Sequence, residues 1–315
     1  MSLYKYRSND KKHLDTLVNN EIFAALPIKL NDPFELKFND NEIRSIVELS
    51  ENLKKYYGET RPKLDEIGIY SLSEDHLSIS LWSLYANESK GFCIEYNLDL
   101  LLSFFAPRTL TCHSNVVYEV TEKFPEFTLA DLDNEKKIYE KTMLTKHIQW
   151  SNEKEYRLVF EKSGQKKVHP QAIKAIYFGE KMPKNSIEIK EGEVSQECVM
   201  NKLKGRNIKY FQVHSRNDAY KLYTTEIEDL YKNYKKISFQ KNNVDHNTID
   251  YESFKEMNIS QEKLKEVISF LEVFPSKIDY IYARKDEIQG AIIVISFENY
   301  KVLKISIPSL RIIPD

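Results

Sequence analysis

The positions of the hydrophobic side chains change period inside the segment 79–96. Its first half places side chains at helical spacing, at Ile79, Trp82, Tyr85, Ala86 and Ser89. Lys90 would then occupy the last helical turn and Gly91 a left-handed C-cap, because glycine adopts positive φ without a steric cost. In the second half, apolar side chains alternate with others, at Phe92, Ile94 and Tyr96. We therefore expect a helix that leads directly into a strand.

A second segment repeats this arrangement around the other of the two tryptophans. Helical spacing runs through residues 135–150, at Tyr139, Met143, Lys146 and Trp150. The pattern breaks at Ser151-Asn152, and the following sequence NEKEYRLVFE alternates as a strand does. Each tryptophan thus lies at a helix-to-strand junction. Burial in the core is the commoner fate of an indole side chain, and a place in a ligand site is the alternative.

Shorter patterns predict the other elements of a mixed fold. Leu3 to Arg7 alternates aromatic and basic residues, so Tyr4 and Tyr6 share one face of a strand while Lys5 and Arg7 share the other. A short amphipathic helix and a strand that ends before Pro27 follow. Further strands are expected at 68–73, 115–119, 156–160 and 174–179, a helix at 42–57, and a hairpin of 208–214 with 219–225. The predicted fold class is α+β, with a mixed, twisted sheet flanked by helices.

The chain divides into two predicted domains. Residues 231–248 are rich in lysine and asparagine and lack a sustained period. We place a motif-bearing α+β domain at 1–230 and a small α+β module of unknown role at 240–315. The module has a helical pattern at 260–273, and its strand patterns lie at 280–284, 290–297 and 302–307.

Composition narrows the functional classes. Charged residues make up 30% of the 315 residues but the net charge is -2, so tight non-specific binding of nucleic acid would need a local basic patch. The 8 glycines form no G-x-G, which argues against a dinucleotide-binding glycine loop and a P-loop, and the three scattered cysteines favour neither a disulfide framework nor structural zinc. Because no apolar run is long enough to span a bilayer, we expect a soluble, cytoplasmic protein without a membrane partner. The oligomeric state is not predicted.

Five motifs occur in order along residues 1–225: LYKYRS at 3–8, KLNDPFE at 29–35, SLS at 71–73, LWSLYANESKGFCIEY at 81–96 and K-x-x-x-W-x-x-E-x-E-Y-R at 146–157. Together they resemble a bacterial and prophage family of domains of unknown function. The chain departs from the usual family pattern at Ser83-Leu84 and Glu88-Ser89, where family members often carry histidine. No role for those histidines is therefore carried over. Family members often lie near phage-defence genes, which implies a phage-defence or toxin effector.

The order of strands and motifs is also similar to that of the ADP-ribosyltransferase superfamily. There, an early strand carries a basic or histidine residue and a late strand presents one glutamate. This resemblance implies an ADP-ribosyltransferase-like fold and an enzyme that consumes NAD as a co-substrate. Cleaving the bond between nicotinamide and ribose requires a carboxylate that stabilises positive charge on the ribose, a basic group for the pyrophosphate, and aromatic walls. The macromolecular target, protein or nucleic acid, is not identified.

We look for the carboxylate that would stabilise positive charge on the ribose in the strand-like sequence NEKEYRLVFE. Glu155 is the leading candidate, with Arg157 two residues away on the same face of that strand and Glu153 as a further catalytic candidate. The alternative for Glu155 and Arg157 is a surface ion pair, worth under about 1 kcal/mol and without a chemical role.

The remaining candidates would bind the NAD co-substrate. Lys5 and Arg7 suit the pyrophosphate because they are cationic, and Tyr6, Trp82 or Tyr85 suit the walls around the nicotinamide. The other candidate cofactor-binding residues are Asn31, Asp32, Phe34, Glu35, Ser73, Lys90 and Trp150.

Two other functions stay open. Glu35-Leu36-Lys37 is an E-x-K triplet close after Asp32, which suits a magnesium-dependent nuclease in which carboxylates hold Mg²⁺ and a lysine steadies the attacking water. A non-enzymatic module that binds a ligand or a protein in a cleft is the third function. If the motifs form one site, these residues should converge in space: Arg7, Asn31, Glu35, Trp82 and Glu155.

Overall fold

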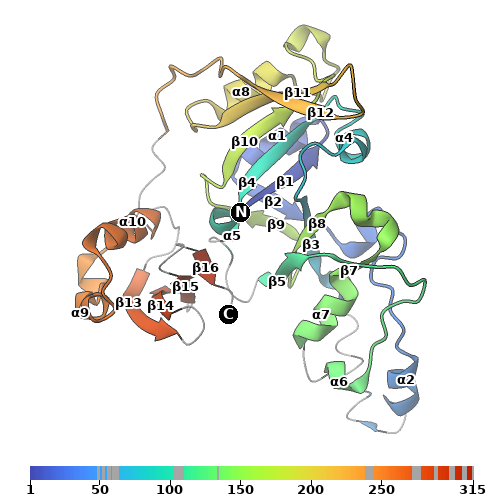
Figure 1. Ribbon diagram of the computed structural model, residues 1–315, viewed down its shortest axis with the longest axis vertical. Helices are drawn as coiled ribbons and strands as arrows, with labels where there is room; N and C mark the ends of the chain where they lie inside the picture. The colour runs from blue at the N-terminus through green and yellow to red at the C-terminus, as the bar shows by residue number, and fades with distance from the viewer. Residues whose placement is uncertain are drawn as a thin grey trace.

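A computed structural model of the protein describes residues 1–47, 50–51, 54, 58, 64–102, 105, 110–132, 135–237, 244–271, 278–286, 290–297, 302–306 and 311–313. Its main feature is a sheet of eight strands in the order β12-β11-β10-β4-β1-β3-β8-β5 (Figure 1). Neighbouring strands are antiparallel, except that β10 and β11 are parallel. The prediction of an α+β fold with a mixed sheet and flanking helices is therefore confirmed.

The strands of this sheet are β1 (Ser2–Arg7), β3 (Gly68–Ser73), β4 (Phe92–Asn97), β5 (Leu110–Asn115), β8 (Glu155–Phe160), β10 (Ile173–Phe178), β11 (Lys209–Ser215) and β12 (Leu222–Ile227). The α-helices are α1 (Lys11–Val18), α2 (Asn41–Val47), α4 (Ile79–Tyr85), α5 (Leu98–Leu102), α6 (Leu129–Leu132), α7 (Glu135–Met143), α8 (Gln196–Leu203), α9 (Tyr251–Glu256) and α10 (Gln261–Leu271). The 3-10 segments are η1 (Pro27–Lys29), η2 (Ile148–Glu153), η3 (Ser186–Glu188) and η4 (His246–Thr248). Two small sheets pair β2 (Glu21–Ala24) with β9 (Gly164–Lys167) and β6 (Val117–Glu119) with β7 (Thr145–His147).

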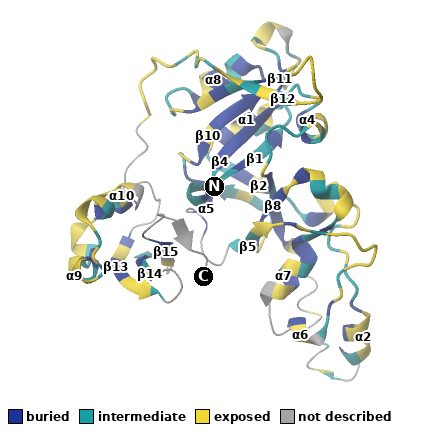
Figure 2. Cartoon of the chain, viewed as in Figure 1, coloured by how far each residue is buried: buried dark blue, intermediate teal, exposed yellow. Residues whose placement is uncertain are grey.

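Helices cover both faces of the large sheet, and its strands β4, β8 and β10 are buried over almost their whole length (Figure 2). On one face, α1, α5 and α8 contribute leucine and valine side chains to the largest hydrophobic cluster. On the other face, α4 packs Trp82 against Tyr6 in one cluster, while α2 and α7 pack against Ile69 and Val159 in a second. This second face is therefore apolar at two places and polar between them.

The residues after the predicted linker form their own sheet, β13 (Ile278–Asp286), β14 (Gly290–Phe297), β15 (Val302–Ser306) and β16 (Arg311–Ile313). α9 and α10 cover it and share a separate hydrophobic cluster that includes Phe254 and Val267. The sequence patterns did not predict α9 or β16. β16 also contacts α5. Residues 238–243 of the predicted linker lie outside the described residues, and the domain boundary stays a prediction.

The helix predicted from residue 79 is shorter than expected. α4 ends at Tyr85, and the residues with left-handed backbone are Asn87, Glu88 and Ser89, with φ of 48°, 55° and 68°. Gly91 is thus not the left-handed C-cap. Glycine is required there for another reason, because a Cβ atom would lie 2.1 Å from the carbonyl oxygen of Arg7.

The helix predicted over 135–150 is also wrong in its second half. α7 ends at Met143, because residues 145–147 pair in parallel with β6 as strand β7. Lys146 therefore lies on a strand, and Trp150 and Glu153 lie in η2. Lys154, with φ of 43°, turns the chain into β8. Glu153 is consequently not part of the strand that carries Glu155, although the strand-like sequence NEKEYRLVFE includes both residues.

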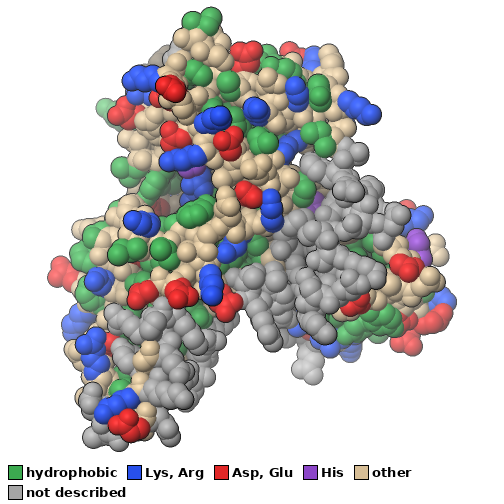
Figure 3. All heavy atoms as spheres, turned by 180° about the vertical axis from the view of Figure 1, so that it is seen from behind, with side chains coloured by type: hydrophobic (Ala, Val, Ile, Leu, Met, Phe, Trp, Pro, Cys, Tyr) green, Lys and Arg blue, Asp and Glu red, His purple; other side chains and the backbone are tan. Residues whose placement is uncertain are grey.

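Among the helices of the described residues, none has both the length and the apolar character needed to cross a membrane. Basic and acidic side chains are interspersed over the described surface visible from behind (Figure 3). That face shows no broad field of one sign, in keeping with the balanced net charge.

Candidate functional site

A cavity of about 280 Å³ opens where two central strands of the large sheet separate. β1 and β3 are neighbours, but their register consists of the single pair Tyr4 and Ser73. Beyond this pair, β1 from Lys5 onwards and β3 at Ser71 line the cavity from opposite sides, and Asn31 contributes to its wall. The cavity therefore lies at the point where strand pairing stops.

Strand register places polar side chains between the two apolar clusters of one sheet face. Ser73 on β3 is opposite Glu155 on β8, and Ser71 is opposite Arg157. Residues paired in this way point to the same side of an antiparallel sheet. Glu155 and Arg157 are only 4% and 0% exposed, so the alternative of a surface ion pair is wrong. Two opposite charges are instead held inside the protein, where each needs a partner.

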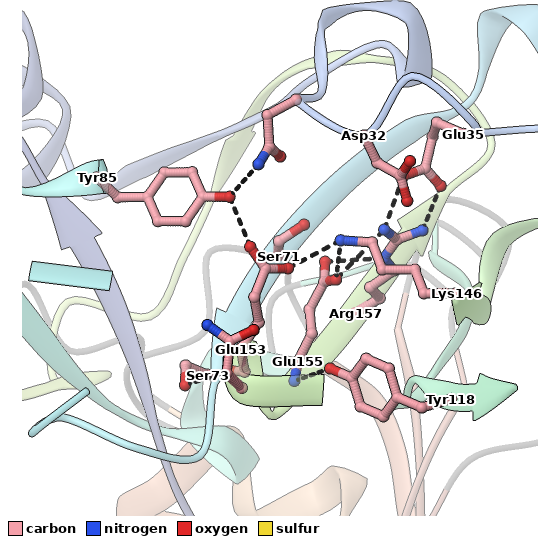
Figure 4. Close-up of polar contacts among 12 residues, drawn as sticks. Asp32, Glu35, Ser71, Ser73, Tyr85, Tyr118, Lys146, Glu153, Glu155 and Arg157 are labelled. Atoms are coloured by element: carbon pink, nitrogen blue, oxygen red, sulfur yellow. Dashed lines mark hydrogen bonds and ion pairs between the residues drawn. The ribbon is translucent and has the colours of Figure 1, made fainter. Parts of the chain in front are cut away.

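Arg157 is the centre of a buried ionic network (Figure 4). Its Nε donates to Oε1 of Glu155 at 2.8 Å. Its Nη1 and Nη2 donate to the two carboxylate oxygens of Glu35 at 2.5 and 2.8 Å, and Nη1 also donates to the carbonyl oxygen of Met143 at 2.6 Å. A planar guanidinium supports this two-pronged contact, which the point charge of a lysine does not. The contact joins the LNDPFE loop to the sheet.

Lys146 extends the network to a second glutamate. Its Nζ lies 2.7 Å from Oε2 of Glu155 and 2.9 Å from Oε2 of Glu153, and it sits over the ring of Trp150 at 5.2 Å from the centroid. The Lys146 side chain is 4% exposed, so this ammonium group is compensated by carboxylates rather than by water.

Glu153 is also fixed from α4 and β3. The hydroxyl of Tyr85 donates to its Oε1 at 2.6 Å, and Nδ2 of Asn31 donates to the same hydroxyl at 2.5 Å. The Ser73 hydroxyl donates to the backbone carbonyl oxygen of Glu153 at 2.7 Å. Both oxygens of the Glu153 carboxylate are thus occupied, one by Tyr85 and the other by Lys146.

The network holds Glu155 in its charged form. Burial alone would raise the pKa of Glu155, but Arg157 and Lys146 outweigh burial and lower that pKa to about 2. Burial would lower the pKa of Arg157, and Glu155 and Glu35 together raise it above its ordinary value. Burial, reinforced by the hydrogen bond to Glu153, raises the pKa of Tyr85. At neutral pH the cavity wall therefore carries the charged carboxylate of Glu155 and the protonated hydroxyl of Tyr85.

The cations of β1 lie at the other side of the cavity. Nζ of Lys5 donates to the carbonyl oxygen of Ser71 across the gap between the strands, at 2.5 Å, and lies over the ring of Tyr70. The guanidinium of Arg7 lies over the same ring. Burial, together with the charge of Arg7, lowers the pKa of Lys5 to about 7. The side-chain amine of Lys5 therefore changes its protonation state near neutral pH.

The structure brings most of the predicted site residues together. The ones that line this cavity are Lys5, Tyr6, Arg7, Asn31, Ser73, Tyr85, Glu153, Glu155 and Arg157. Glu35 reaches the network through Arg157, and Trp150 contacts Lys146.

Four other candidates lie elsewhere. Trp82 does not line the cavity: it is buried, its ring packs edge-on against Tyr6, and its Nε1 donates to the carbonyl oxygen of His76 at 2.8 Å. Core packing was therefore the correct alternative for this indole. Lys90 forms an exposed ion pair with Glu88 at 3.1 Å, outside the site. Asp32 and Phe34 line a different cavity.

The site also contains residues that were not among the candidates from the sequence. Lys146 and Ser71 belong to the quoted motifs but were given no role, and the motif spacing was the available signal for both. His13 lines the cavity from α1, and the Tyr118 hydroxyl accepts a hydrogen bond from the backbone N–H of Glu155 at 2.8 Å. No pattern in the sequence pointed to His13 or Tyr118, because their proximity depends on tertiary packing.

The second cavity has a volume of about 290 Å³ and adjoins the first, since Lys146 lines both. The LNDPFE loop contributes to both as well, with Leu30 and Asn31 on one side and Asp32 and Phe34 on the other. The loop and Lys146 therefore lie between two chambers.

The E-x-K triplet does not form a metal site in this arrangement. Both oxygens of Glu35 accept hydrogen bonds from Arg157, and Lys37 lines the second cavity. Across the part of the chain that the structure describes, no group of three histidine, cysteine, aspartate or glutamate side chains is placed to hold a metal ion.

Comparison with known protein families finds a match to part of the chain. Neither the curated proteins nor the solved structures contain a significant match to the chain. A family model matches from within α4 into β8, which includes Lys146, Glu153 and Glu155, whereas β1 and the LNDPFE loop lie outside the matched part. The expected resemblance to a family of domains of unknown function is thereby confirmed. Residues 81–158 match the family described as protein of unknown function, DUF2971.

Proposed function

We propose that the protein is an ADP-ribosyltransferase-like enzyme that consumes NAD in the cavity between β1 and β3. The observation that carries the proposal is the position of Glu155, a buried carboxylate that two cations keep charged at the wall of a cavity whose opposite side carries Lys5 and Arg7. An anion at one end and cations at the other match the two ends of a nicotinamide–ribose–phosphate ligand.

The chemistry needs little proton transfer, because nicotinamide leaves its cationic bond to ribose as a neutral molecule. As this bond lengthens, positive charge develops on the ribose. A carboxylate fixed in a site that excludes water stabilises that charge without having to reorganise. In our proposal Glu155 supplies this carboxylate, and Ser71 and Asn31 lie at the cavity wall within reach of ribose hydroxyls.

In our proposal Lys5 and Arg7 bind the pyrophosphate of NAD. Ligand cavities range from roughly 300 to 1,000 Å³, and the cavity of about 280 Å³ is at the lower limit. It suits the nicotinamide–ribose half of the dinucleotide, and the adenosine half would extend past Arg7 towards Ser8 and His13, which line that end. Tyr6 and Tyr85 then take the role of aromatic walls that the sequence also offered to Trp82.

The arrangement of strands supports an ADP-ribosyltransferase-like fold as part of the proposal. β1, β3 and β8 are adjacent in the sheet, so the LYKYRS, SLS and E-x-E-Y-R motifs meet although they are far apart in the chain. In this reading the early strand presents the basic residues and the late strand the glutamate. A role as phage-defence or toxin effector follows from the family resemblance and remains part of the proposal.

A ligand-binding module without catalysis is the competing proposal, favoured by one observation. Both carboxylates of the cavity wall are already bound by cations, so their ion pairs are suited to holding the shape of a binding site. The magnesium-nuclease proposal has less support, because Arg157 occupies the carboxylate of Glu35.

Release of nicotinamide from NAD by the full chain tests the proposal, with Glu155→Gln as the decisive variant. Removing the charge should cost a few kcal/mol in the transition state and slow release roughly 10²-fold or more. The substitution should also lower the stability of the fold, because Glu155 is buried between two cations. Rates are therefore measured at a temperature where circular dichroism shows the variant to be folded.

Two control variants make the result specific. Glu95→Gln removes a similarly buried carboxylate that is bound by Lys174 and Tyr177 away from the cavity, and it should keep the wild-type rate. Glu153→Gln tests the neighbouring carboxylate. Equal turnover by wild type and Glu155→Gln would remove Glu155 from the mechanism, and NAD binding without turnover would favour the non-catalytic module.

A further inference from the structure

The second cavity combines features that select a cation. Phe34 and Phe124 present their rings there, 58% and 44% exposed, with ring centroids 6.0 Å apart. Asp32 lines the same cavity and is only 6% exposed. One of its oxygens accepts a hydrogen bond from the backbone N–H of Phe34 at 2.9 Å. Aromatic faces and a buried carboxylate are both complementary to positive charge.

Asp32 lacks a cationic partner within the described part of the chain, in contrast to the other buried acids nearby. Glu153 and Glu155 are bound by Lys146, and Glu35 is bound by Arg157. A buried carboxylate without a compensating cation is costly. A ligand that brings its own positive charge removes this cost.

The other charged groups around the cavity do not reverse this preference. Lys37 and Lys123 are exposed and are balanced in number by the exposed Glu119 and Glu122. The ammonium group of Lys146 is compensated by its two glutamates. The buried charge that remains to be satisfied is therefore that of Asp32.

We propose that the second cavity binds a cationic side chain of a polypeptide, lysine or arginine, as the acceptor of the ADP-ribosyl group. As an acceptor site it rests on the proposed NAD chemistry. Glu155 marks the position of the ribose in the first cavity, and Lys146 lies between that position and the second cavity. The acceptor thus approaches from the side opposite the pyrophosphate cations of β1.

The bonds that break and form in the transfer balance, and so does the proton that is released. The bond between the ribose carbon and nicotinamide breaks, and its electron pair leaves with neutral nicotinamide. A nitrogen of the acceptor forms the new bond to that carbon and loses one proton. Water that reaches the exposed residues lining the second cavity, such as Lys37, Glu119 and Lys123, takes this proton.

The test begins with binding and does not depend on turnover. The full chain is titrated with a short peptide that has one central arginine or lysine, and with the same peptide carrying neutral citrulline or norleucine there. The cationic peptides should bind and the neutral ones should bind about tenfold or more weakly, since a charge-assisted contact with Asp32 is lost. Asp32→Asn keeps the oxygen that Phe34 needs and removes the charge, so it should abolish the preference. Asp40→Asn, an equally buried aspartate paired with Arg44, should retain it.

A second arm adds labelled NAD and follows transfer to the peptide. Transfer to the cationic peptides, reduced in Asp32→Asn through a higher KM for the peptide, supports the acceptor role. Equal binding of charged and neutral peptides, or a preference that survives in Asp32→Asn, overturns the cation site. Nicotinamide release without transfer to the bound peptide overturns the acceptor role alone, whereas the absence of any NAD turnover overturns the proposed function and the acceptor role with it.

Discussion

Arg157 and Glu35 are 122 positions apart in the sequence and form a two-pronged ion pair inside the protein, with both side chains at most 4% exposed. The pair fastens the loop that separates the two cavities to the strand that carries Glu155. Because one guanidinium serves Glu35, Glu155 and the carbonyl oxygen of Met143, both the stability and the shape of the site depend on it.

Breaking this pair should destabilise the fold. Glu35→Gln removes one charge and leaves the buried guanidinium of Arg157 undercompensated, which costs about 3–5 kcal/mol in the free energy of unfolding. Urea unfolding measures this loss. Glu42→Gln, on the exposed side of α2, is the control and should change stability by no more than about 0.5 kcal/mol. A loss of the same small size for Glu35→Gln would show that the pair contributes little.

Acid should weaken the protein through Glu155. Its pKa is about 2 in the folded protein against an ordinary value of 4.5, so the unfolded chain binds the proton first as pH falls. The stabilisation is complete above pH 4.5 and is lost between pH 4.5 and 2, and it amounts to about 3 kcal/mol. Unfolding free energies measured across this range should fall more steeply for wild type than for Glu155→Gln. If the unfolding free energies of the two proteins fell equally with pH, Glu155 would not be the group responsible for the loss of stability in acid.

Ligand binding should depend on pH through Lys5. With a pKa of about 7, Lys5 is protonated below neutral pH and attracts a pyrophosphate, whereas above pH 7 binding must first restore the proton. NAD affinity, measured by calorimetry, should therefore decrease by up to about tenfold for each pH unit above 7. Lys5→Arg stays charged over this range, so it should show a flat profile. The same slope in both proteins would assign the titration to another group.

The C-terminal part should be dispensable for folding of the first domain. It forms a separate sheet with a separate hydrophobic cluster, and the contacts described between the two parts include one between α5 and β16. A chain truncated near Lys241 should keep cooperative thermal unfolding, with a modest loss of stability from the uncovered side of α5. Non-cooperative melting of the truncated chain would show that the boundary is misplaced.

Local patterns were sufficient for most of the strands. Alternation identified β1 and β4 closely, because the period of two depends on the residues of the strand itself. Helix ends were less predictable. α7 stops at Met143 because the following residues pair with β6, and a pairing partner elsewhere in the chain cannot be read from the segment itself. Trp82 and Trp150 had equivalent local patterns, and packing made one a core residue and the other a neighbour of Lys146.

The sequence by itself determined which residue types are available for the site, and in which order along the chain the strands that carry them occur. The motifs supplied Lys5, Arg7, Ser73 and Glu155 at the positions where the structure places them around the cavity. The tertiary structure alone decided the charge state of the site. Whether Glu155 and Arg157 were a surface pair or a buried one depended on Lys146 and Glu35, which pack against them from other elements. Burial and pairing with residues distant in the sequence set the pKa values of these groups, and neither is a property of the neighbouring sequence.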